Sequence, residues 1–446
     1  MRIGLFTDTY FPQVSGVSTS ICTLKEELEK EGHEVYIFTT TDKAVKRYED
    51  PTIIRLPSVP FVSFTDRRVV YRGLISSYKI AKQYKLDIIH TQTEFSVGVF
   101  KGKMIAAASP HFLRYTLIIL SMRIMLVTLP KGKIIKPGMV KYIIRGYLND
   151  LDGVICPSRI VLNLLEGYDI KIPKRVIPTG IRVEEYERKD ITAEDAKALR
   201  DKLGIADDET MLLSLSRVSY EKNIQAILKQ FPEVLSENKR VKLVVVGDGP
   251  YLQDLKDLVA ELGIEEAVIF TGMVPHDETA LYYKASDFFI SASTSETQGL
   301  TYTESLASGT PVIAHGNPYL DDIIDQKMFG TLFYHEEDLA DAILDAIADT
   351  PAMDERTYKE KMYAISAEHF GKSVYAFYLD VLISAKNKKK SKLSLTVRSQ
   401  DEKTSIKFAQ SAIKMPAKAV KATAKTSAKV VKAPKRLINS IRDFID

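Results

Sequence analysis

The sequence predicts an α/β protein that contains two doubly wound parallel sheets. Short apolar runs alternate with helical patterns, and the alternation restarts after a polar linker at residues 184–208. Strands separated by helices form parallel sheets with helical crossovers, and 446 residues are enough for two or three domains. We therefore expect a first domain over 1–183, a second over 184–365, a helix over 366–385 that crosses back to the first domain, and a basic tail over 386–446.

Each half has its own series of strand candidates, which are apolar runs bounded by turn residues. After the first strand come a Gly/Ser loop at 12–18 and a helix that ends at Lys30, and the strands of this half are expected at 2–6, 35–39, 53–56, 87–90, 154–156 and 176–177. Those of the second half are expected at 211–215, 242–246, 267–270, 288–291, 311–314 and 331–333. Helices are expected between them at 224–235, 251–262, 276–284, 300–308 and 337–347. Ligands of such sheets bind at the carboxyl ends of the strands, so the functional residues should lie in the loops that follow.

Composition excludes several protein classes. With 45% apolar and 27% charged residues, the chain is typical of soluble globular proteins and not of disordered ones. Its two cysteines, Cys22 and Cys156, are typical of buried thiols in a reducing compartment. We expect no secretory signal, because the apolar start is followed at once by Thr7 and Asp8. The longest apolar run, at 117–129, contains a charge and is too short to span a bilayer.

Charge is divided unevenly along the chain. Residues 386–446 contain 17 Lys or Arg and 4 Asp or Glu, a net charge of +13, whereas residues 1–385 have a net charge of −9. A segment so rich in Lys, Ala, Ser and Thr buries too little apolar area to fold alone. Its charge favours an anionic membrane or a nucleic acid, unless it is only a solvated tail. Nucleic acid is disfavoured, because only Phe408 and Phe444 place aromatic rings in the basic run.

Cations and glycine turns follow the strands of the second half. Arg217 and Lys222 lie on one strand-to-helix loop, and such a pair suits a diphosphate, with Arg binding as a fork and Lys as a point charge. Gly272 and Val274 follow a later strand and suit a backbone shelf for a base. A Gly-Asp-Gly turn at 247–249 is a weak signal, since many turns between strands and helices contain it.

Two acids flank the start of the helix expected at 300–308. The backbone N–H groups of Gly299, Leu300 and Thr301 are unpaired at that start and available to an anion. Glu304 is about one turn into the helix, where it can reach a ribose diol. Glu296 lies in the preceding loop and can accept hydrogen bonds from sugar hydroxyls.

Three longer stretches suggest a family. Residues 2–17 are Arg-Ile-Gly-Leu-Phe-Thr-Asp-Thr-Tyr-Phe-Pro-Gln-Val-Ser-Gly-Val, residues 89–95 are Ile-His-Thr-Gln-Thr-Glu-Phe, and residues 149–158 are Asn-Asp-Leu-Asp-Gly-Val-Ile-Cys-Pro-Ser. With the Arg-x4-Lys and Glu-x7-Glu spacings, they resemble family 4 of the retaining glycosyltransferases, which have the GT-B fold of two Rossmann-like domains facing a cleft. Within that family they resemble the 1,2-diacylglycerol 3-α-glucosyltransferases of Gram-positive bacteria. The resemblance covers about residues 1–385, except for one gap.

The resemblance implies an activity. The chain would transfer glucose from UDP-glucose to 1,2-diacylglycerol with retention, making α-monoglucosyldiacylglycerol for glycolipid and lipoteichoic acid anchor synthesis at the cytoplasmic membrane face. Arg217 and Lys222 would stabilise the leaving diphosphate, and Glu296 would contact the glucose, so these three are the catalytic candidates. Neither a metal nor a cofactor is expected, because the two cations neutralise the phosphates.

The resemblance also assigns donor-binding residues. Glu304 would bind the ribose, and Gly16 would let the first loop approach the diphosphate without a Cβ clash. The complete donor-binding set comprises Gly16, Gly272, Val274, Gly299, Leu300, Thr301 and Glu304.

An acceptor dissolved in a membrane requires a membrane-facing surface. Residues 67–85 show helical periodicity, with five basic candidates in one stretch, namely Arg67, Arg68, Arg72, Lys79 and Lys82. A basic amphipathic helix binds an anionic lipid surface, and the alternative is a core-facing helix with a solvated basic face. The resemblance favours the membrane, and the basic tail would add a second electrostatic contact. We therefore expect a peripheral protein on the inner face of the cell membrane.

The gap in the resemblance lies at 106–131. Relatives carry a stretch similar to His-Thr-Tyr-His-Thr-Met-Tyr-Glu-Asp-Tyr-Val, with a His near the sugar, whereas this chain has Thr-Leu-Ile-Ile-Leu-Ser-Met-Arg-Ile-Met at 116–125. When the family stretch is back-translated into codons and read one base later, the new codons can encode the residue of this chain at every one of these positions except Ser121. We hypothesise that 106–131 is frame-shifted, which would also explain why 95–149 has no Asp or Glu where about seven are expected. The alternative is a genuine apolar loop that enters the membrane.

Other functions stay open at this point. The chain could be another family 4 hexosyltransferase with a different acceptor, or a catalytically impaired homologue that still binds membranes. Sequence alone does not decide between glucose and galactose, and it leaves the oligomeric state unknown.

Overall fold

The structure of the protein is a computed structural model, which describes most of the chain up to residue 385. The described residues are 1–13, 15–42, 44–45, 50–61, 64–70, 82–93, 113–117, 137–149, 151–296, 298–385 and 387. The chain divides into a compact unit over 1–381 and a second unit over 382–446. The predicted basic tail therefore lies outside the described residues, apart from residue 387.

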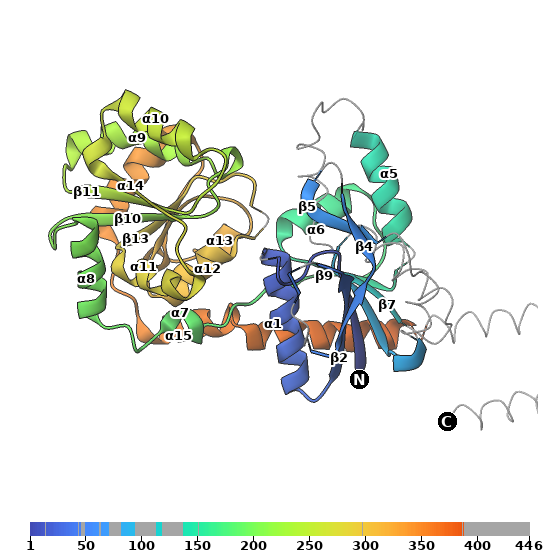
Figure 1. Ribbon diagram of the computed structural model, residues 1–446. Coiled ribbons are helices and arrows are strands. Elements are labelled where there is room, and N and C mark those ends of the chain that lie inside the picture. The colour runs from blue at the N-terminus through green and yellow to red at the C-terminus, as the bar shows by residue number, and fades with distance from the viewer. Residues whose placement is uncertain are drawn as a thin grey trace, which may run out of the picture. The chain divides into compact units, whose positions relative to one another are not determined.

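The first lobe of the compact unit contains a parallel sheet in the order β3-β2-β1-β6-β7-β8-β9 (Figure 1). Its strands are β1 (Arg2–Phe6), β2 (Glu34–Thr40), β3 (Ile53–Leu56), β6 (Ile88–Thr91), β7 (Leu113–Leu117), β8 (Gly153–Cys156) and β9 (Lys174–Val176). Its helices include α1 (Gly16–Lys30), α5 (Pro137–Leu148) and α6 (Arg159–Gly167). A separate antiparallel ribbon pairs β4 (Ser58–Phe61) with β5 (Phe64–Val70).

The second lobe contains a parallel sheet in the order β12-β11-β10-β13-β14-β15. Its strands are β10 (Thr210–Leu215), β11 (Val241–Val246), β12 (Val268–Gly272), β13 (Phe288–Ser291), β14 (Val312–His315) and β15 (Gly330–Phe333). Its α-helices are α7 (Glu184–Glu187), α8 (Ala193–Leu203), α9 (Ile224–Glu237), α10 (Leu252–Leu262), α11 (Thr279–Ala285), α12 (Leu300–Ala307), α13 (Leu320–Ile323), α14 (Leu339–Asp349) and α15 (Glu355–Ala364). Short 3-10 turns are η2 (Tyr220–Lys222), η3 (Glu265–Ala267), η4 (His276–Glu278), η5 (Lys327–Phe329) and η6 (Glu336–Asp338). The predicted α/β class is confirmed, with parallel strands in both sheets.

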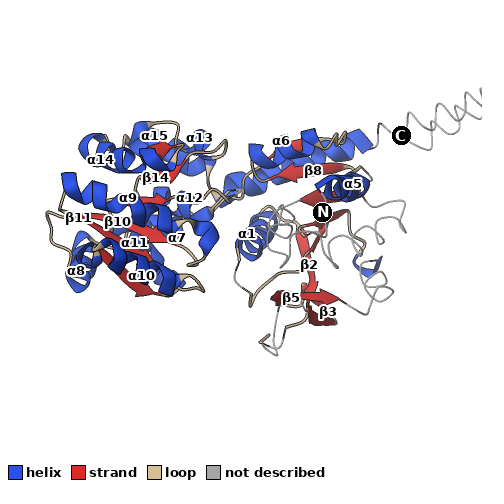
Figure 2. Cartoon of the chain, turned by 90° about the horizontal axis from the view of Figure 1, so that it is seen from above, coloured by secondary structure: helices blue, strands red, loops and turns tan. Residues whose placement is uncertain are grey.

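Helices cover both faces of the second-lobe sheet, with α9, α10 and α14 on one side and α8, α11 and α12 on the other (Figure 1). Figure 2 shows the helices and strands of this lobe from above. Consecutive residues of a strand point to opposite faces. Accordingly Met211 and Leu213 belong to the core cluster beneath one set of helices, and Leu212 belongs to the cluster beneath the other. Burial on both faces explains why these strands are nearly continuous apolar runs.

The chain crosses between the lobes twice, and the two crossing segments are paired. Ile181 and Ser366 form an isolated parallel bridge, in which the Ile181 N–H donates to the carbonyl of Ile365 at 3.0 Å and the Ala367 N–H donates to the carbonyl of Ile181 at 2.7 Å. A Cβ on Gly180 would overlap the backbone of Ser366, so glycine is required for this approach.

A helix over 367–385 follows the second crossing and packs on the first lobe. Its apolar face contributes to the same buried cluster as Ile3 and Leu5 of β1, through Phe370, Val374, Phe377, Tyr378 and Val381. Within the described ranges, no helix is both long enough and apolar enough to cross a membrane.

Two sequence predictions were wrong. The segment at 184–208 was expected to be a linker, but it contains α7 and α8, and α8 has a capping box between Thr192 and Asp195 and a left-handed Gly204 at its end. Its helical signal was obscured because it buries little apolar surface. The helix predicted at 67–85 fails at its start, because Arg67 and Arg68 lie on β5, where pairing with β4 fixes an extended backbone.

The atypical segment at 106–131 supplies an interior strand. Leu113–Leu117 forms β7, which pairs with β6 on one side and β8 on the other. The remainder of the segment lies outside the described residues. The sheet is therefore continuous across the part of this stretch that is described.

Candidate active site

The strand order of the second lobe determines where its ligand crevice lies. Counted within the lobe, the order is 3-2-1-4-5-6, so the connections after the neighbouring strands β10 and β13 diverge to opposite faces. The loop after β10 carries Arg217 and Lys222, and the loop after β13 carries Glu296. The three predicted catalytic residues therefore border the same crevice.

Lys222 and Glu296 are in direct contact across this crevice. The Lys222 ammonium forms an ion pair with Oε1 of Glu296, and the two side chains are only 27% and 21% exposed. Arg217 is exposed, and within the described part of the chain no carboxylate forms an ion pair with it. Its guanidinium therefore keeps its donors for an anionic ligand.

The glycines of the turn at 247–249 support the loop that carries Arg217. A Cβ on Gly247 would overlap the carbonyl oxygen of Ser216, and one on Gly249 would overlap that of Val218. In the same contact the Val218 N–H donates to the carbonyl of Asp248 at 3.0 Å. The turn that was a weak signal in the sequence therefore fixes the backbone on either side of Arg217.

The start of α12 presents backbone donors without a side-chain cap. Gly299 occupies the N-cap position with φ of 75°, and among the described side chains none caps the helix. A Cβ on Gly299 would lie 2.6 Å from the buried ring of Tyr302. Glycine is therefore required both for the positive φ and for the close approach of this ring. Leu300 and Thr301 follow in the first turn and are partly exposed. This is the geometry that suits an anion.

Glu304 lies about one turn further along α12, between two tyrosines. The Tyr283 hydroxyl donates to its Oε2 at 3.1 Å, and Tyr186 is also hydrogen-bonded to it. Burial raises the pKa of the Glu304 carboxyl, and the hydrogen bonds from the two tyrosines oppose the rise.

Glu304 also borders a cavity of about 590 Å³. Its walls come from α1, from the first crossing segment and from the region around η4, and they are formed by Phe11, Thr19, Cys22, Thr23, Ile181, Arg182, Glu184, Glu185, Tyr186, Arg188, His276, Asp277 and Glu304. The cavity thus joins both lobes within the compact unit. Its size is in the range of small-molecule sites.

The other predicted donor residues lie on other elements, and the Gly247 N–H donates to the carbonyl of Gly272 at 2.9 Å. Gly272 ends β12 with φ of 72°, and Val274 is partly buried against the core. Gly16 begins α1, and a Cβ there would meet nothing within 4 Å. The open space is compatible with a ligand approaching the start of α1, but within the described residues no hydrogen bond or ion pair joins Gly16, Gly272 or Val274 to the catalytic candidates.

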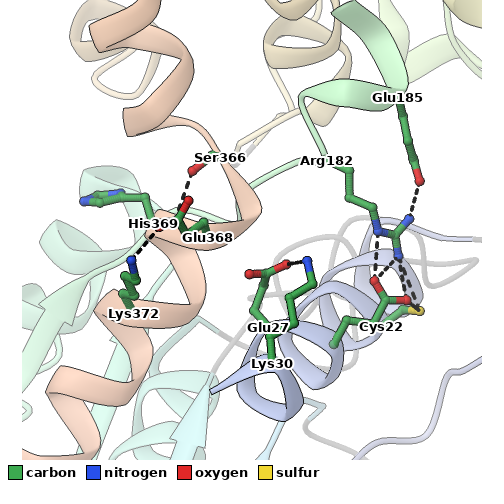
Figure 3. Close-up of polar contacts among 10 residues, drawn as sticks. Cys22, Glu27, Lys30, Arg182, Glu185, Ser366, Glu368, His369 and Lys372 are labelled. Atoms are coloured by element: carbon green, nitrogen blue, oxygen red, sulfur yellow. Dashed lines mark hydrogen bonds and ion pairs between the residues drawn. The ribbon is translucent and has the colours of Figure 1, made fainter. Parts of the chain in front are cut away.

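An ion-pair cluster beside the cavity was missed by sequence reasoning. Arg182 donates to Glu26 at 2.9 Å and to Glu185 at 2.7 Å, and its guanidinium also contacts the thiol of Cys22 (Figure 3). Glu26 and Arg182 are 156 positions apart. No sequence signal marks the pair, because each residue alone is an ordinary surface charge.

Gln298 was also missed. It lies between Glu296 and α12, and its buried amide is bonded to the backbone of Thr179 in the first crossing segment. Only the fold brings these residues together.

In the first lobe the strand order reverses between β1 and β6, which places the corresponding crevice at the ends of these two strands. Asp8 and Thr93 meet there, with the Thr93 hydroxyl donating to Oδ2 of Asp8 at 2.8 Å. His90 is fully buried beneath them, 2.5 Å from the hydroxyl of Tyr378, and burial lowers its pKa to about 3. Gln92 is also fully buried, and no residue of the described ranges hydrogen-bonds to either of its amide atoms.

The membrane candidates are only partly described. Arg68 donates to the hydroxyl of Ser58 at 3.0 Å and to its carbonyl at 2.9 Å, so its guanidinium closes the β4–β5 ribbon. Lys82 is exposed. Arg72 and Lys79 lie outside the described residues. Among the residues that are described, no group of three His, Cys, Asp or Glu side chains is arranged to hold a metal ion.

Comparison with known proteins identifies the family. Residues 14–185 match the model described as "Glycosyltransferase Family 4", and residues 195–362 match "Glycosyl transferases group 1". The chain is 58% identical over 452 aligned positions to the alpha-monoglucosyldiacylglycerol synthase of Streptococcus pneumoniae, covering 100% of this chain and 99% of that one. It belongs to the family 4 glycosyltransferases.

Two further comparisons agree with this family. The alpha-monoglucosyldiacylglycerol synthase of Acholeplasma laidlawii is 30% identical over 412 residues, which are 88% of this chain and 100% of that one. The solved structure of Anabaena HepE in complex with UDP superposes with a TM-score of 0.65 at 16% identity, covering 85% of this chain and 100% of that one. The predicted GT-B fold is thereby confirmed.

Proposed function

We propose that this glycosyltransferase transfers glucose from UDP-glucose to 1,2-diacylglycerol with retention of configuration, forming α-monoglucosyldiacylglycerol. The observation that carries the proposal is the 58% identity, over the whole chain, to a protein named for that product. The geometry supports it, because two cations and an acid border the switch-point crevice and an uncapped helix start lies beside them.

In the proposed complex the second lobe binds the donor. Arg217 and Lys222 bind the diphosphate and stabilise the charge that develops as the bond from the glucose C1 to the β-phosphate oxygen breaks. Glu296 accepts hydrogen bonds from glucose hydroxyls, and its ion pair places Lys222 beside the sugar. Glu304 binds the ribose, next to the first-turn N–H groups of α12. The similar fold solved with UDP supports a uridine nucleotide.

Retention follows from attack on the face that the leaving group occupies. The acceptor hydroxyl forms the new C1–O bond on that face, and its proton passes to the departing phosphate oxygen. No base from the protein is required in this scheme. The stabilisation of the leaving group therefore dominates the rate, and removing one such donor typically costs about 10²- to 10³-fold in kcat.

We also propose that the enzyme works as a peripheral protein on the inner face of the cell membrane. The support is the net charge of +13 in 386–446 and the lipid acceptor that the relative's name implies. Binding to vesicles with and without anionic lipid, at low and high salt, tests this. Equal binding to neutral and anionic vesicles would contradict it.

The activity is tested with radiolabelled UDP-glucose and diacylglycerol in anionic vesicles, followed by NMR of the lipid product. We expect an α-linked monoglucosyl lipid, with UDP-galactose and soluble acceptors giving less product. A β-linked product, or transfer only to a soluble acceptor, would refute the proposal. The same assay on a variant with the family stretch restored at 106–131 measures whether that segment impairs catalysis.

The proposal includes independence from metals. Because Arg217 and Lys222 supply the positive charge that a divalent ion would otherwise supply, EDTA should leave the initial rate within about twofold. A loss that added Mg²⁺ or Mn²⁺ restores would contradict this part alone and leave the proposed transfer intact.

A further inference from the structure

One buried side chain attaches the Glu296 loop to the crossing segment between the lobes. Gln298 is 7% exposed, and its amide pairs with both backbone groups of Thr179. The Thr179 N–H donates to Oε1 of Gln298 at 3.0 Å, and Nε2 of Gln298 donates to the carbonyl of Thr179 at 2.7 Å. An amide that satisfies a donor and an acceptor of one residue fixes both distance and orientation.

The connection continues into the first lobe. The Thr179 hydroxyl lies 2.9 Å from the hydroxyl of Ser20 on α1, and both residues are buried. Ser20 is about one helical turn from Gly16, the first residue of α1, which we propose lets the diphosphate approach. An unbroken series of buried hydrogen bonds therefore joins α1, the crossing segment and the loop that carries Glu296.

We propose that Gln298, Thr179 and Ser20 are positioning residues that keep the Glu296 loop of the second lobe in register with the first lobe during transfer. The inference rests on the proposed function, because it assigns Glu296 to the sugar. The three residues act through Glu296 and α1. Buried networks of this kind resist partial disruption, since an unpaired polar group costs more in the interior than in water.

A positioning role predicts that glucosyl transfer and nucleotide binding respond differently when the connection is loosened. Transfer requires acceptor and donor to be aligned, and therefore requires both lobes, whereas the proposed UDP contacts come mainly from the second lobe. Loosening the connection should lower kcat and leave the Kd of UDP unchanged. A merely structural role would instead change the folded fraction and reduce both signals together.

Thr179→Val is the primary variant, because it removes the hydroxyl and keeps the backbone groups that Gln298 binds. Thr310→Val is the matched control: Thr310 is also buried, and its hydroxyl donates to the carbonyl of Tyr283 at 2.7 Å within the second lobe. We expect Thr179→Val to lower kcat about fivefold with the Kd of UDP unchanged, and Thr310→Val to leave both unchanged. Wild-type kcat in Thr179→Val, or equal losses in the two variants, would overturn the proposal.

Gln298→Met provides a measurement that does not depend on the acceptor. It removes both hydrogen bonds to Thr179, and we expect the Thr179 amide to exchange with solvent at least about tenfold faster than in the wild type. Unchanged exchange would overturn the proposed connection even if the enzyme is active. An inactive wild type with faster exchange in Gln298→Met would refute the proposed function and keep the connection. If Gln298→Met does not fold, Thr179→Val and Thr310→Val still decide the question.

Discussion

The two lobes share a fold but differ in what borders their crevices. In the second lobe the crevice between β10 and β13 is bordered by charged groups, with Lys222 paired to Glu296 and Arg217 exposed beside them. In the first lobe the crevice between β1 and β6 holds the Asp8 carboxylate, which accepts a hydrogen bond from Thr93, together with the buried imidazole of His90, whose lowered pKa keeps it neutral. The same topology therefore presents cations in the second lobe and a carboxylate in the first.

The difference indicates a division of labour. A diphosphate leaving group needs fixed positive charge, which the second lobe supplies on the loop after β10. A lipid hydroxyl carries no charge, so its binding does not require a fixed cation. The proposed donor and acceptor sides thus match the chemistry that each must bind.

The largest effect on kcat should come from removing the positive charge of Lys222 from the crevice of the second lobe. Lys222→Ala should lower kcat about 10²- to 10³-fold, because the leaving phosphate loses a direct stabilising cation. Lys229→Ala is the control, since Lys229 is an exposed lysine of α9 away from the crevice. Steady-state kinetics with UDP-glucose measure both variants. More than a fifth of wild-type kcat in Lys222→Ala would show that the charge is not needed there.

The next largest effect should come from displacing the loop without changing its charge. Gly249→Ala places a methyl group against the carbonyl oxygen of Val218, so we expect a loss of about 1–3 kcal/mol in unfolding free energy and a lower kcat. Gly146→Ala on α5 meets nothing within 4 Å and should instead stabilise by about 0.5–1 kcal/mol. Urea unfolding and kinetics on both variants test this. Equal stabilities for the two would mean that the loop accommodates the methyl group.

In the first lobe we expect an effect on stability that is smaller per pH unit. His90 has its pKa lowered to about 3 by burial, so between that pH and about 6.5 the unfolded chain binds a proton that the folded chain does not. Stability should therefore fall with falling pH, by up to about 1.4 kcal/mol per pH unit from this residue. His90→Gln should reduce the slope, and Tyr378→Phe should keep it. An unchanged slope in His90→Gln would show that other groups cause the acid sensitivity.

The smallest expected effect concerns Glu304. Burial raises the pKa of its carboxyl, so the folded chain holds the proton to a higher pH than the unfolded chain does. Stability should fall as pH rises from the usual carboxyl range through the raised pKa, and stay constant above it. Glu304→Gln should abolish this fall, while Glu337→Gln, at an exposed position, should have no effect. Denaturant titrations between about pH 4 and 8 measure the difference, and parallel curves for wild type and Glu304→Gln would contradict the prediction.

Much of the fold was predictable, because burial on both faces of a sheet leaves a local trace in the sequence. The second-half strands were placed to within one or two residues, and β1, β3 and β13 were placed at their observed bounds. The same reasoning failed at α8, whose helix is mostly polar, and at β5, where basic residues at helical spacing lie on a ribbon. Periodicity reports burial, and α8 buries only Leu199, whereas the extended backbone of β5 is fixed by its pairing with β4 and not by its own spacing of residues.

The sequence by itself determined the fold class, the family, and the loops on which Arg217, Lys222, Glu296 and Glu304 lie. Only the tertiary structure decided what those loops contact: the ion pair between Lys222 and Glu296, the close approach that requires Gly249, and the amide of Gln298 on Thr179. The physical reason is that apolar patterning is a property of neighbouring residues, whereas a hydrogen-bond partner or a steric limit depends on which distant segment packs against the site. The residues that hold the loops in place are therefore invisible until the chain is folded.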